Sequence, residues 1–233
     1  MAQTRLNNPP SRIADLVGLK EKGSVVTCQT SFEILPVDFA HRDNPFQAFI
    51  FLCSYKGVID GDAYEFRKCY ARGCPHNLCP HVSQAVMIAN RYLQKDYHKL
   101  EKAGIELERR LFTLEDMTVK FDGYQKEYDA TLVIHDYINI AKEGNEVSVV
   151  VDLEYVPGVE HFVGYDNEMI FMMAGFTITC LGKTQHYERC LACFQMEREK
   201  EEKQYRIGIA NERLKIRYDE FDQTSITYEK RFF

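Results

Sequence analysis

Apolar residues recur every three or four positions after residue 81, which is the spacing of one face of an α-helix. The stripe consists of Val82, Ala85, Val86, Ala89, Leu93, Tyr97 and Leu100. Gly104 follows the stripe, and glycine is common just past the C-terminal end of a helix. The spacing therefore predicts a long amphipathic helix that ends near residue 103.

Runs of β-branched and aromatic residues before this helix predict strands. They cover residues 25–28, 32–35, 46–59 and 63–70. Pro36 ends the second run, and Asp60-Gly61 separates the last two as the tight turn of a β-hairpin. A short helix is expected over residues 11–20, with Ser11 as its N-cap.

The second half of the chain has mostly the pattern of β-structure. Strands are expected over residues 127–140, 147–156, 168–181, 207–218 and 225–233. The first two flank a turn at residues 142–145 and form a predicted hairpin, which Pro157-Gly158 ends. The charge run over residues 197–203 is typical of a solvated helix face. No internal repeat with a period of 20–50 residues is evident.

These elements predict an α+β fold. A small metal-bound hairpin-helix module is expected around residues 45–103, followed by a β-rich antiparallel C-terminal portion. The corresponding domains are residues 1–110, a metal-binding region with N-terminal strands, and the β-rich residues 111–233. No low-complexity linker separates them, so a single domain is the alternative.

The composition is that of a globular protein, with 45% hydrophobic and 27% charged residues. The net charge of −6 argues against a protein whose whole surface binds nucleic acid. No apolar run reaches the roughly 18 residues of a membrane-spanning helix, and the N-terminus lacks a signal-peptide pattern. The chain is therefore expected in the cytoplasm, without a membrane partner. Disulfides are uncommon there, so its eight cysteines are expected as free thiols or metal ligands.

The densest group of reactive side chains lies between residues 69 and 81. Three cysteines and two histidines fall within these thirteen residues, and such side chains can converge on one metal ion. A tetrahedral zinc site needs four ligands. The predicted ligands are Cys69, Cys74, Cys79 and His81, with His76 as a fifth candidate. The last pair opens the helix, where the backbone amides favour thiolates.

The segment from about residue 49 to residue 93 resembles a SWIM-type zinc finger. That family has the pattern C-x-C, a variable gap and C-x-H at the start of a helix. Cys79-Pro-His81 matches the second part, whereas Cys69 and Cys74 are separated by four residues rather than one. The resemblance implies a zinc-stabilised module that binds nucleic acid or protein and does not catalyse a reaction.

An iron–sulfur cluster is the alternative use of the same cysteines. A [4Fe–4S] cluster takes four thiolates, often with a proline after one of them. Cys69, Cys74 and Cys79 would supply three, and Pro75 and Pro80 follow two of these. The fourth would come from a distant position, namely Cys53, Cys180 or Cys193. This hypothesis predicts a redox protein or an enzyme subunit.

A second group of cysteines has the spacing C-x9-C-x2-C. It consists of Cys180, Cys190 and Cys193, with His186 between the first two. The C-x2-C pair is common in zinc and redox sites, so the group can form a second site or join the first. No βαβ pattern surrounds it, which argues against thioredoxin-like chemistry. The alternative is that these are small buried hydrophobic residues, which we favour for Cys180.

Basic residues accompany the first cysteine group. Nine Lys and Arg residues stand against four acidic ones between residues 67 and 110, a local excess of +5. The candidate contact residues are Arg67, Lys68, Arg72 and Arg91. They can bind nucleic-acid phosphates or an acidic protein surface, although solvated lysines and arginines are the commoner outcome.

No sequence motif predicts a reaction. The chain has no P-loop, G-x-G-x-x-G, G-x-S-x-G or H-E-x-x-H motif. The leading hypothesis is an intracellular zinc-binding interaction protein for nucleic acid or protein. An enzyme whose metal is structural stays as a further alternative.

Overall fold

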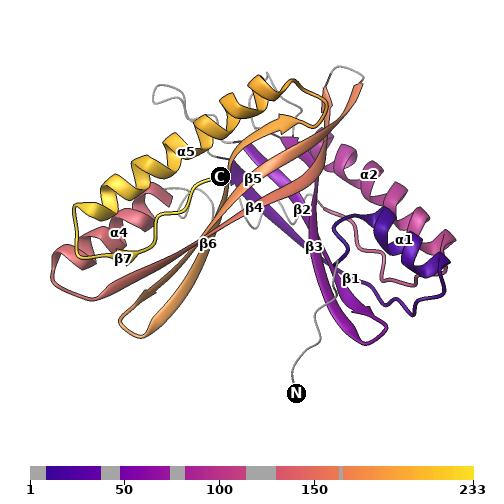
Figure 1. Ribbon diagram of the computed structural model, residues 1–233, viewed down its shortest axis with the longest axis horizontal. Coiled ribbons are helices and arrows are strands. Elements are labelled where there is room, and N and C mark those ends of the chain that lie inside the picture. The colour runs from indigo at the N-terminus through magenta and orange to yellow at the C-terminus, as the bar shows by residue number, and fades with distance from the viewer. Residues whose placement is uncertain (1–8, 38–47, 74–81, 114–129, 163–164) are drawn as a thin grey trace. The chain divides into compact units, whose positions relative to one another are not determined.

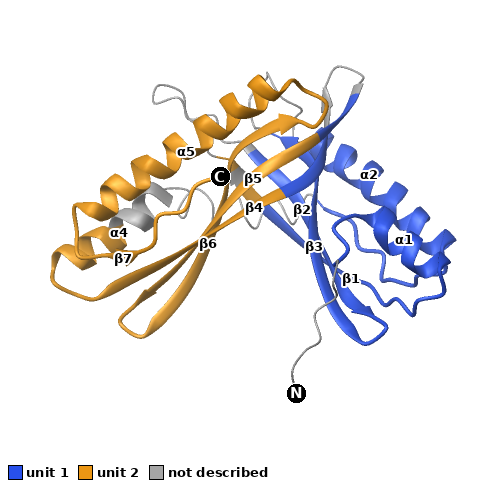
Figure 2. Cartoon of the chain, in the orientation of Figure 1, with its two compact units in different colours: residues 1–34, 49–114, 156–168 blue, residues 35–48, 115–155, 169–233 orange. Residues whose placement is uncertain are grey.

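The computed structural model of the protein describes residues 9–37, 48–73, 82–113, 130–162 and 165–233 (Figure 1). Helices and a mixed sheet of seven strands make up the described parts, so the predicted α+β class is confirmed. The hydrogen-bonded strand order is β3-β2-β1-β6-β5-β4-β7, with a further pairing between β3 and β4. The chain divides into two compact units, each built from three segments of the sequence (Figure 2).

Unit 1 contains residues 1–34, 49–114 and 156–168. Its elements are α1 (Ile13–Glu21), most of β1 (Gln29–Val37) and β2 (Ala48–Ile59), β3 (Asp62–Gly73), α2 (Val82–Lys102) and the end of β4 (Val147–Phe162). β2 and β3 form the predicted hairpin, and α1 and α2 lie side by side on one face of these strands (Figure 1).

Unit 2 contains residues 35–48, 115–155 and 169–233. Its elements are α4 (Ala130–Lys142), the first part of β4, most of β5 (Tyr165–Cys180), β6 (Lys183–Gln195), α5 (Lys200–Asp222) and β7 (Thr227–Tyr228). β5 and β6 form an antiparallel hairpin, and α5 packs on β6. The core joins these strands to α5 through Phe176, Leu214, Tyr218 and Phe221.

The two halves of the sequence are copies of one structural plan. Each runs through a helix, three strands that are neighbours in the sheet and a long helix, namely α1-β1-β2-β3-α2 and α4-β4-β5-β6-α5. Residues 13–112 align with residues 134–233 at a constant offset of 121 (134 − 13) without a gap, and 18 of these positions are identical. We call these segments repeat 1 and repeat 2.

An asparagine ties the last helix of each repeat to the chain that follows it. Asn90 Nδ2 donates to the Phe112 carbonyl at 2.8 Å, and Phe112 N donates to Asn90 Oδ1 at 2.9 Å. Asn211 and Phe233, 121 residues later, exchange the same two hydrogen bonds at 3.3 and 2.9 Å. This pairing satisfies backbone groups that would otherwise lose water on burial.

A tyrosine about two helical turns after each asparagine makes a second hydrogen bond that is the same in both repeats. Tyr97 donates its hydroxyl to the Arg110 carbonyl at 2.6 Å, and Tyr218 donates to the Arg231 carbonyl at 2.6 Å. The positions again differ by 121 residues. Hydrogen bonds that match in partner atoms and in offset show that the repeats share their tertiary structure, not only their element order.

Each unit includes a segment of the other repeat. Residues 156–168 belong to unit 1, and the corresponding residues of repeat 1 belong to unit 2. In unit 1, Cys69 of β3 pairs with Gly158 in parallel, and in unit 2 Val37 pairs with Cys190 in the same way. The ends of β1 and β4 are therefore exchanged between the units.

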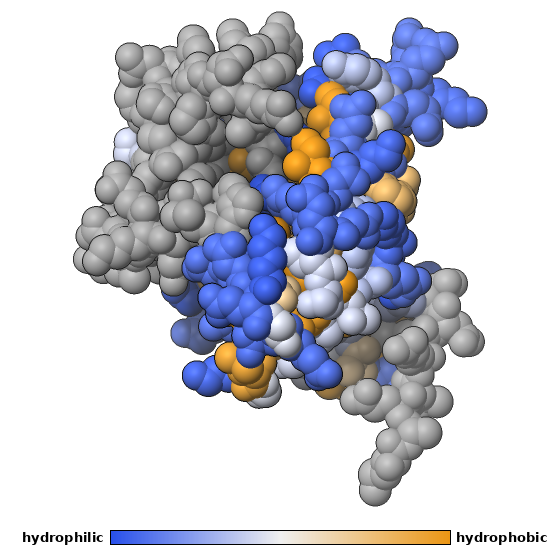
Figure 3. Space-filling model, turned by 90° about the vertical axis from the view of Figure 1, so that its left-hand side faces the viewer, coloured by the Kyte–Doolittle hydropathy of each residue, from blue (hydrophilic) through white to orange (hydrophobic). Residues whose placement is uncertain are grey.

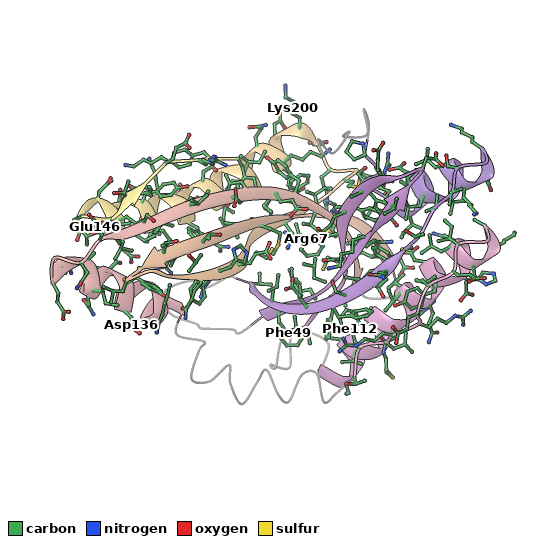
Figure 4. All side chains as sticks on the ribbon, turned by 90° about the horizontal axis from the view of Figure 1, so that it is seen from below. Phe49, Arg67, Phe112, Asp136, Glu146 and Lys200 are labelled. Carbon is green, nitrogen blue, oxygen red and sulfur yellow. The ribbon has the colours of Figure 1, made fainter. Side chains whose placement is uncertain are left out.

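Aromatic rings fill the core of unit 1. Phe112 packs edge-on against Phe32 and Phe51, with ring centroids 4.7 and 5.0 Å apart, and Phe51 packs against Phe49 at 5.5 Å. Figure 4 shows Phe49 and Phe112 close together on this side of the sheet. The segment after α2 is thereby held to α2 by the backbone of Phe112 and to the strands by the ring of Phe112.

Several predicted elements are confirmed. The helix after residue 81 is α2, the helix expected over residues 11–20 is α1, and the hairpin turns at Asp60-Gly61. The strands expected near residues 147 and 168 are β4 and β5.

Other predicted elements are wrong. Residues 130–142 form a helix and not a strand, because Ile134, Ile138 and Ala141 follow the three-to-four spacing that their β-branched neighbours obscured. The segment 207–218 lies inside α5, whose buried Ala210, Leu214 and Tyr218 are each four residues apart. The expected β-rich C-terminal portion is therefore a mixture of helices and strands.

Prolines and the predicted hairpin also behave differently from the expectation. β1 continues past Pro36 to Val37, and β4 continues past Pro157 to Phe162. β4 pairs with β5 and β7 rather than with residues 127–140. Only the short stretch Thr227–Tyr228 of the expected last strand is a strand.

The hairpin turns of the two repeats have the same backbone but different side chains. Asp60 and Gly61 have φ values of 51° and 99°, and Leu181 and Gly182 have 49° and 73°. Aspartate tolerates the left-handed region and here accepts a hydrogen bond from Val25 N at 2.8 Å. Leucine lacks that compensation and is 71% exposed.

We predict that Leu181→Asn stabilises the protein by about 0.5–1 kcal/mol, because asparagine adopts the left-handed conformation at lower cost. Urea unfolding followed by circular dichroism measures the change. Asp60→Leu, which introduces the opposite change at the matched position, is expected to lower stability. A Leu181→Asn protein that is less stable than the wild type would contradict this explanation of the turn.

Candidate functional site

Most of the predicted metal ligands lie outside the described residues. This applies to Cys74, Cys79 and His81, and to the fifth candidate His76. The described chain ends at Gly73 on one side of the segment and resumes at Val82 on the other. The segment therefore connects β3 to α2, two elements that pack on each other in unit 1.

Cys69 is the one predicted zinc ligand within the described residues. Its side chain is fully buried, and its thiol donates a hydrogen bond to the Ala71 carbonyl at 3.4 Å. Within the described ranges, no three His, Cys, Asp or Glu side chains gather where they could hold a metal ion. Cys69 would thus have to bind metal together with side chains of the segment 74–81.

Cys190 is the repeat equivalent of Cys69 and has the same environment. It is fully buried, and its thiol donates to the Ala192 carbonyl at 3.4 Å. The equivalents of residues 74–81 are residues 195–202, which contain neither cysteine nor histidine. A buried cysteine is thus common to both repeats, whereas the Cys/His segment belongs to repeat 1 alone.

Strand pairing separates cysteines that the iron–sulfur hypothesis and the hypothesis of a second metal site would bring together. Cys53 faces Lys68 across the β2–β3 ladder, so it points to the opposite face of the sheet from Cys69. Cys180 lies seven residues beyond Met173, the residue opposite Cys190, which is about 23 Å of extended strand. The structure therefore does not bring Cys180 together with Cys190.

The remaining cysteines are buried free thiols. Cys190 and Cys193 lie opposite Met173 and Phe171, on one face of β6, because a bulge lies between them. Burial raises the pKa of Cys53 to about 12, so that thiol stays protonated at neutral pH. Cys28 is likewise buried, and burial raises its pKa.

The predicted contact residues have different environments. Arg91 is exposed on α2, whereas Arg67 and Arg72 on β3 are half-buried. Lys68 is turned inward, and its ammonium group contacts Asp96 Oδ2 at 2.5 Å. Arg67, Lys68 and Arg72 therefore do not form one exposed basic patch with Arg91.

Sequence reasoning missed a buried polar network between β2, β3 and α2. Asp96 of α2 is only 2% exposed. Its carboxylate accepts hydrogen bonds from Lys68, from the Tyr70 hydroxyl at 2.7 Å and from Lys99 at 3.3 Å. Tyr70 is in turn hydrogen-bonded to the Tyr55 hydroxyl. The sequence contains a signal for this network, because the charged Asp96 lies on the apolar stripe of the predicted helix.

Burial controls the protonation of the two tyrosines. Both are fully buried, which raises the pKa of Tyr55 and of Tyr70 well above its usual range. They stay neutral and pass hydrogen bonds toward the Asp96 carboxylate. The two lysines compensate its charge, so the network satisfies an otherwise costly buried anion.

Repeat 2 has different side chains at the positions equivalent to this polar network. Tyr55, Tyr70 and Cys53 correspond to Phe176, Leu191 and Ala174, which are apolar. Asp96 and Lys99 correspond to Arg217 and Glu220, an ion pair of reversed sign at 2.9 Å. The fold therefore does not require the hydroxyl network, which is a property of unit 1.

No helix in the described parts of the chain is long and apolar enough to cross a membrane. On the face shown in Figure 3, hydrophobic side chains of the described residues form small separate patches among hydrophilic ones. The described residues on that face form no broad apolar surface of the kind that marks a large docking site.

Comparison of the chain with family models, with curated proteins and with solved structures gives no match. The resemblance to a SWIM-type zinc finger therefore stays a prediction. Repeat 1 and repeat 2 can, however, be compared with each other.

We predict that Asp96→Ala lowers the free energy of unfolding by about 3 kcal/mol, because it leaves Lys68 and Tyr70 without their buried acceptor. Lys230→Ala is the control, since its ion pair with Asp222 is about half exposed on both sides and should contribute less than about 1 kcal/mol. Urea unfolding measures both variants. Equal losses would contradict the importance of the buried network.

Alkaline pH is expected to destabilise unit 1. The pKa values of Tyr55 and Tyr70 are higher in the folded state than in the unfolded state, so their contribution is complete below about pH 10 and falls as the pH rises further. Urea unfolding at pH 8, 10 and 11 measures the loss. Tyr55→Phe, which copies Phe176 of repeat 2, should show a shallower decline, and an unchanged decline would exclude this cause.

Proposed function

We propose that the protein is a zinc-binding interaction protein whose metal joins the end of β3 to the start of α2. The proposed ligands are Cys69, Cys74, Cys79 and His81. Three of them lie in the segment 74–81, and thiolate and imidazole ligands are those that structural zinc prefers. Partners would be nucleic acid or protein.

One observation carries this proposal. In the alignment of the repeats without a gap, residues 74–81 of repeat 1 contain two cysteines and two histidines, whereas the equivalent residues 195–202 of repeat 2 contain none. The equivalent segment of repeat 2 reads Gln-Met-Glu-Arg-Glu-Lys-Glu-Glu. Two cysteines and two histidines within eight residues, absent from the equivalent segment of the other repeat, are better explained by metal chemistry than by packing.

Metal binding would stabilise unit 1 locally. α2 packs on β3 and carries Asp96 of the buried network, so a metal at the connection would hold the helix in register with that strand. Such binding free energy is part of the folding free energy, and its removal weakens the element that the metal holds. The metal would be structural, and an interaction surface would be built on the elements that it orders.

Elemental analysis of protein purified without oxygen is expected to give about one zinc per chain and no visible colour. Cys69→Ala and Cys190→Ala form a matched pair, because both remove a buried thiol with the same hydrogen bond. Cys69→Ala should lose zinc, whereas Cys190→Ala should lose only stability. Cys79→Ala is expected to lose zinc as well.

Each other outcome has a definite meaning. Iron with labile sulfide would replace the proposal with the iron–sulfur hypothesis, and the absence of metal would refute both. Zinc retained by Cys69→Ala but lost by His76→Ala would exchange Cys69 for His76 in the ligand set. The metal proposal would then stand with the ligands of the segment alone.

A further inference from the structure

All exposed charged residues of α2 are basic. They are Arg91, Lys95, Lys99 and Lys102, and none of the exposed residues of this helix is acidic. The two acids of α2 are occupied elsewhere, since Asp96 is buried in the network and Glu101 is paired with Arg109. We call these four residues the α2 basic face.

The basic face is largely free to meet a ligand. Within the described residues, neither Arg91 nor Lys102 has an ion-pair partner. Lys95 lies 3.8 Å from Asp166, and both side chains stay about half exposed. Lys99 also contacts Asp96 at 3.3 Å but is 63% exposed. The exposed pair of Lys95 contributes little and exchanges readily for a stronger anion, whereas Lys99 also compensates the buried charge of Asp96.

Repeat 2 shows that the fold does not require these charges. The equivalents of the four residues are Glu212, Ile216 and Glu220 on α5 and Gln223 directly after it. Several buried positions of the same two helices are instead preserved, as with Ala89/Ala210 and Leu93/Leu214. The charge on the outer face has therefore diverged between the repeats, whereas several buried positions of the two helices have not.

We propose that the α2 basic face binds the phosphate backbone of a nucleic acid. Residues 91, 95, 99 and 102 follow one side of the helix, where successive cations are about 4.5–6 Å apart along the axis. Regularly spaced exposed cations neutralise phosphates and release counterions. The remaining exposed residues include Gln94 and His98, which can also donate hydrogen bonds to phosphate oxygens.

The chemistry of the helix favours nucleic acid over a lipid surface. A helix that binds membranes exposes an apolar face, but the apolar side of α2 is buried through Ala89, Leu93 and Leu100. Met87 is its one large exposed apolar residue within the described range. Binding without base-specific contacts is expected, since the face presents charges rather than a motif that reads base edges.

This inference deepens the proposed function by naming the class of partner, and it rests on the role of the protein in interaction. It does not require the metal. Zinc without nucleic-acid binding would leave the metal proposal standing and refute the basic face. Nucleic-acid binding through α2 by a protein without zinc would do the reverse.

The test compares two double variants that change the net charge equally. Lys95→Gln/Lys102→Gln alters the α2 basic face, and Lys200→Gln/Lys215→Gln removes two exposed lysines of α5. Fluorescence anisotropy with a labelled 20-base-pair duplex and a 20-nucleotide single strand gives the affinity at several salt concentrations. All four substitutions are exposed, and circular dichroism melting checks that each protein folds.

For the wild type, the logarithm of the affinity is expected to fall linearly with the logarithm of the salt concentration. The α2 double variant should bind more weakly, with a slope reduced by about 2, one for each lost phosphate contact. The α5 double variant should keep the slope of the wild type. This pattern would assign the contacts to α2.

Other results would overturn the proposal. They are no salt-dependent binding by the wild type, equal losses in the two double variants, or binding to vesicles of anionic phosphatidylserine but not to either oligonucleotide. Self-association of the wild type that only the α2 double variant abolishes, without nucleic-acid binding, would make a second copy of the chain the partner of this face.

Discussion

Burial of the last helix of each repeat against its three strands is the constraint on which both units depend. α2 and α5 share the buried Ala89/Ala210 and Leu93/Leu214, and each helix is tied to the following chain by an asparagine and a tyrosine. These contacts combine apolar burial with satisfied backbone groups, so a change at any of them has a large cost. They persist where most other positions of the repeats differ.

Residues that do not take part in this shared packing can change without loss of the fold, and the repeats differ at such residues. The interior of unit 1 has a carboxylate, two lysines and two tyrosines where repeat 2 has apolar residues and an ion pair of opposite sign. The exposed face of the last helix is basic in one repeat and contains two glutamates in the other. A duplicated fold can lose or gain such features in one copy while the shared core maintains stability.

The proposed functions both fall on features that repeat 1 does not share with repeat 2. The Cys/His segment precedes α2 in the sequence, and the α2 basic face runs from the middle to the end of that helix, which also carries Asp96. A metal that orders this helix would thereby also order the surface that meets a partner. Cys69 is the exception, because Cys190 reproduces its burial and its hydrogen bond.

The sequence by itself determined the features that depend on neighbouring residues. Helical spacing located α2, Asp60-Gly61 located a hairpin, and the density of cysteine and histidine located the candidate metal segment, because spacing and turn chemistry act within a few residues. The tertiary structure decided the rest. Helix formation by residues 130–142 overrode β-branched composition, strand pairing placed Cys53 and Cys69 on opposite faces, and Asp96 found partners 26 and 28 residues away. These outcomes depend on long-range packing, which no local pattern contains.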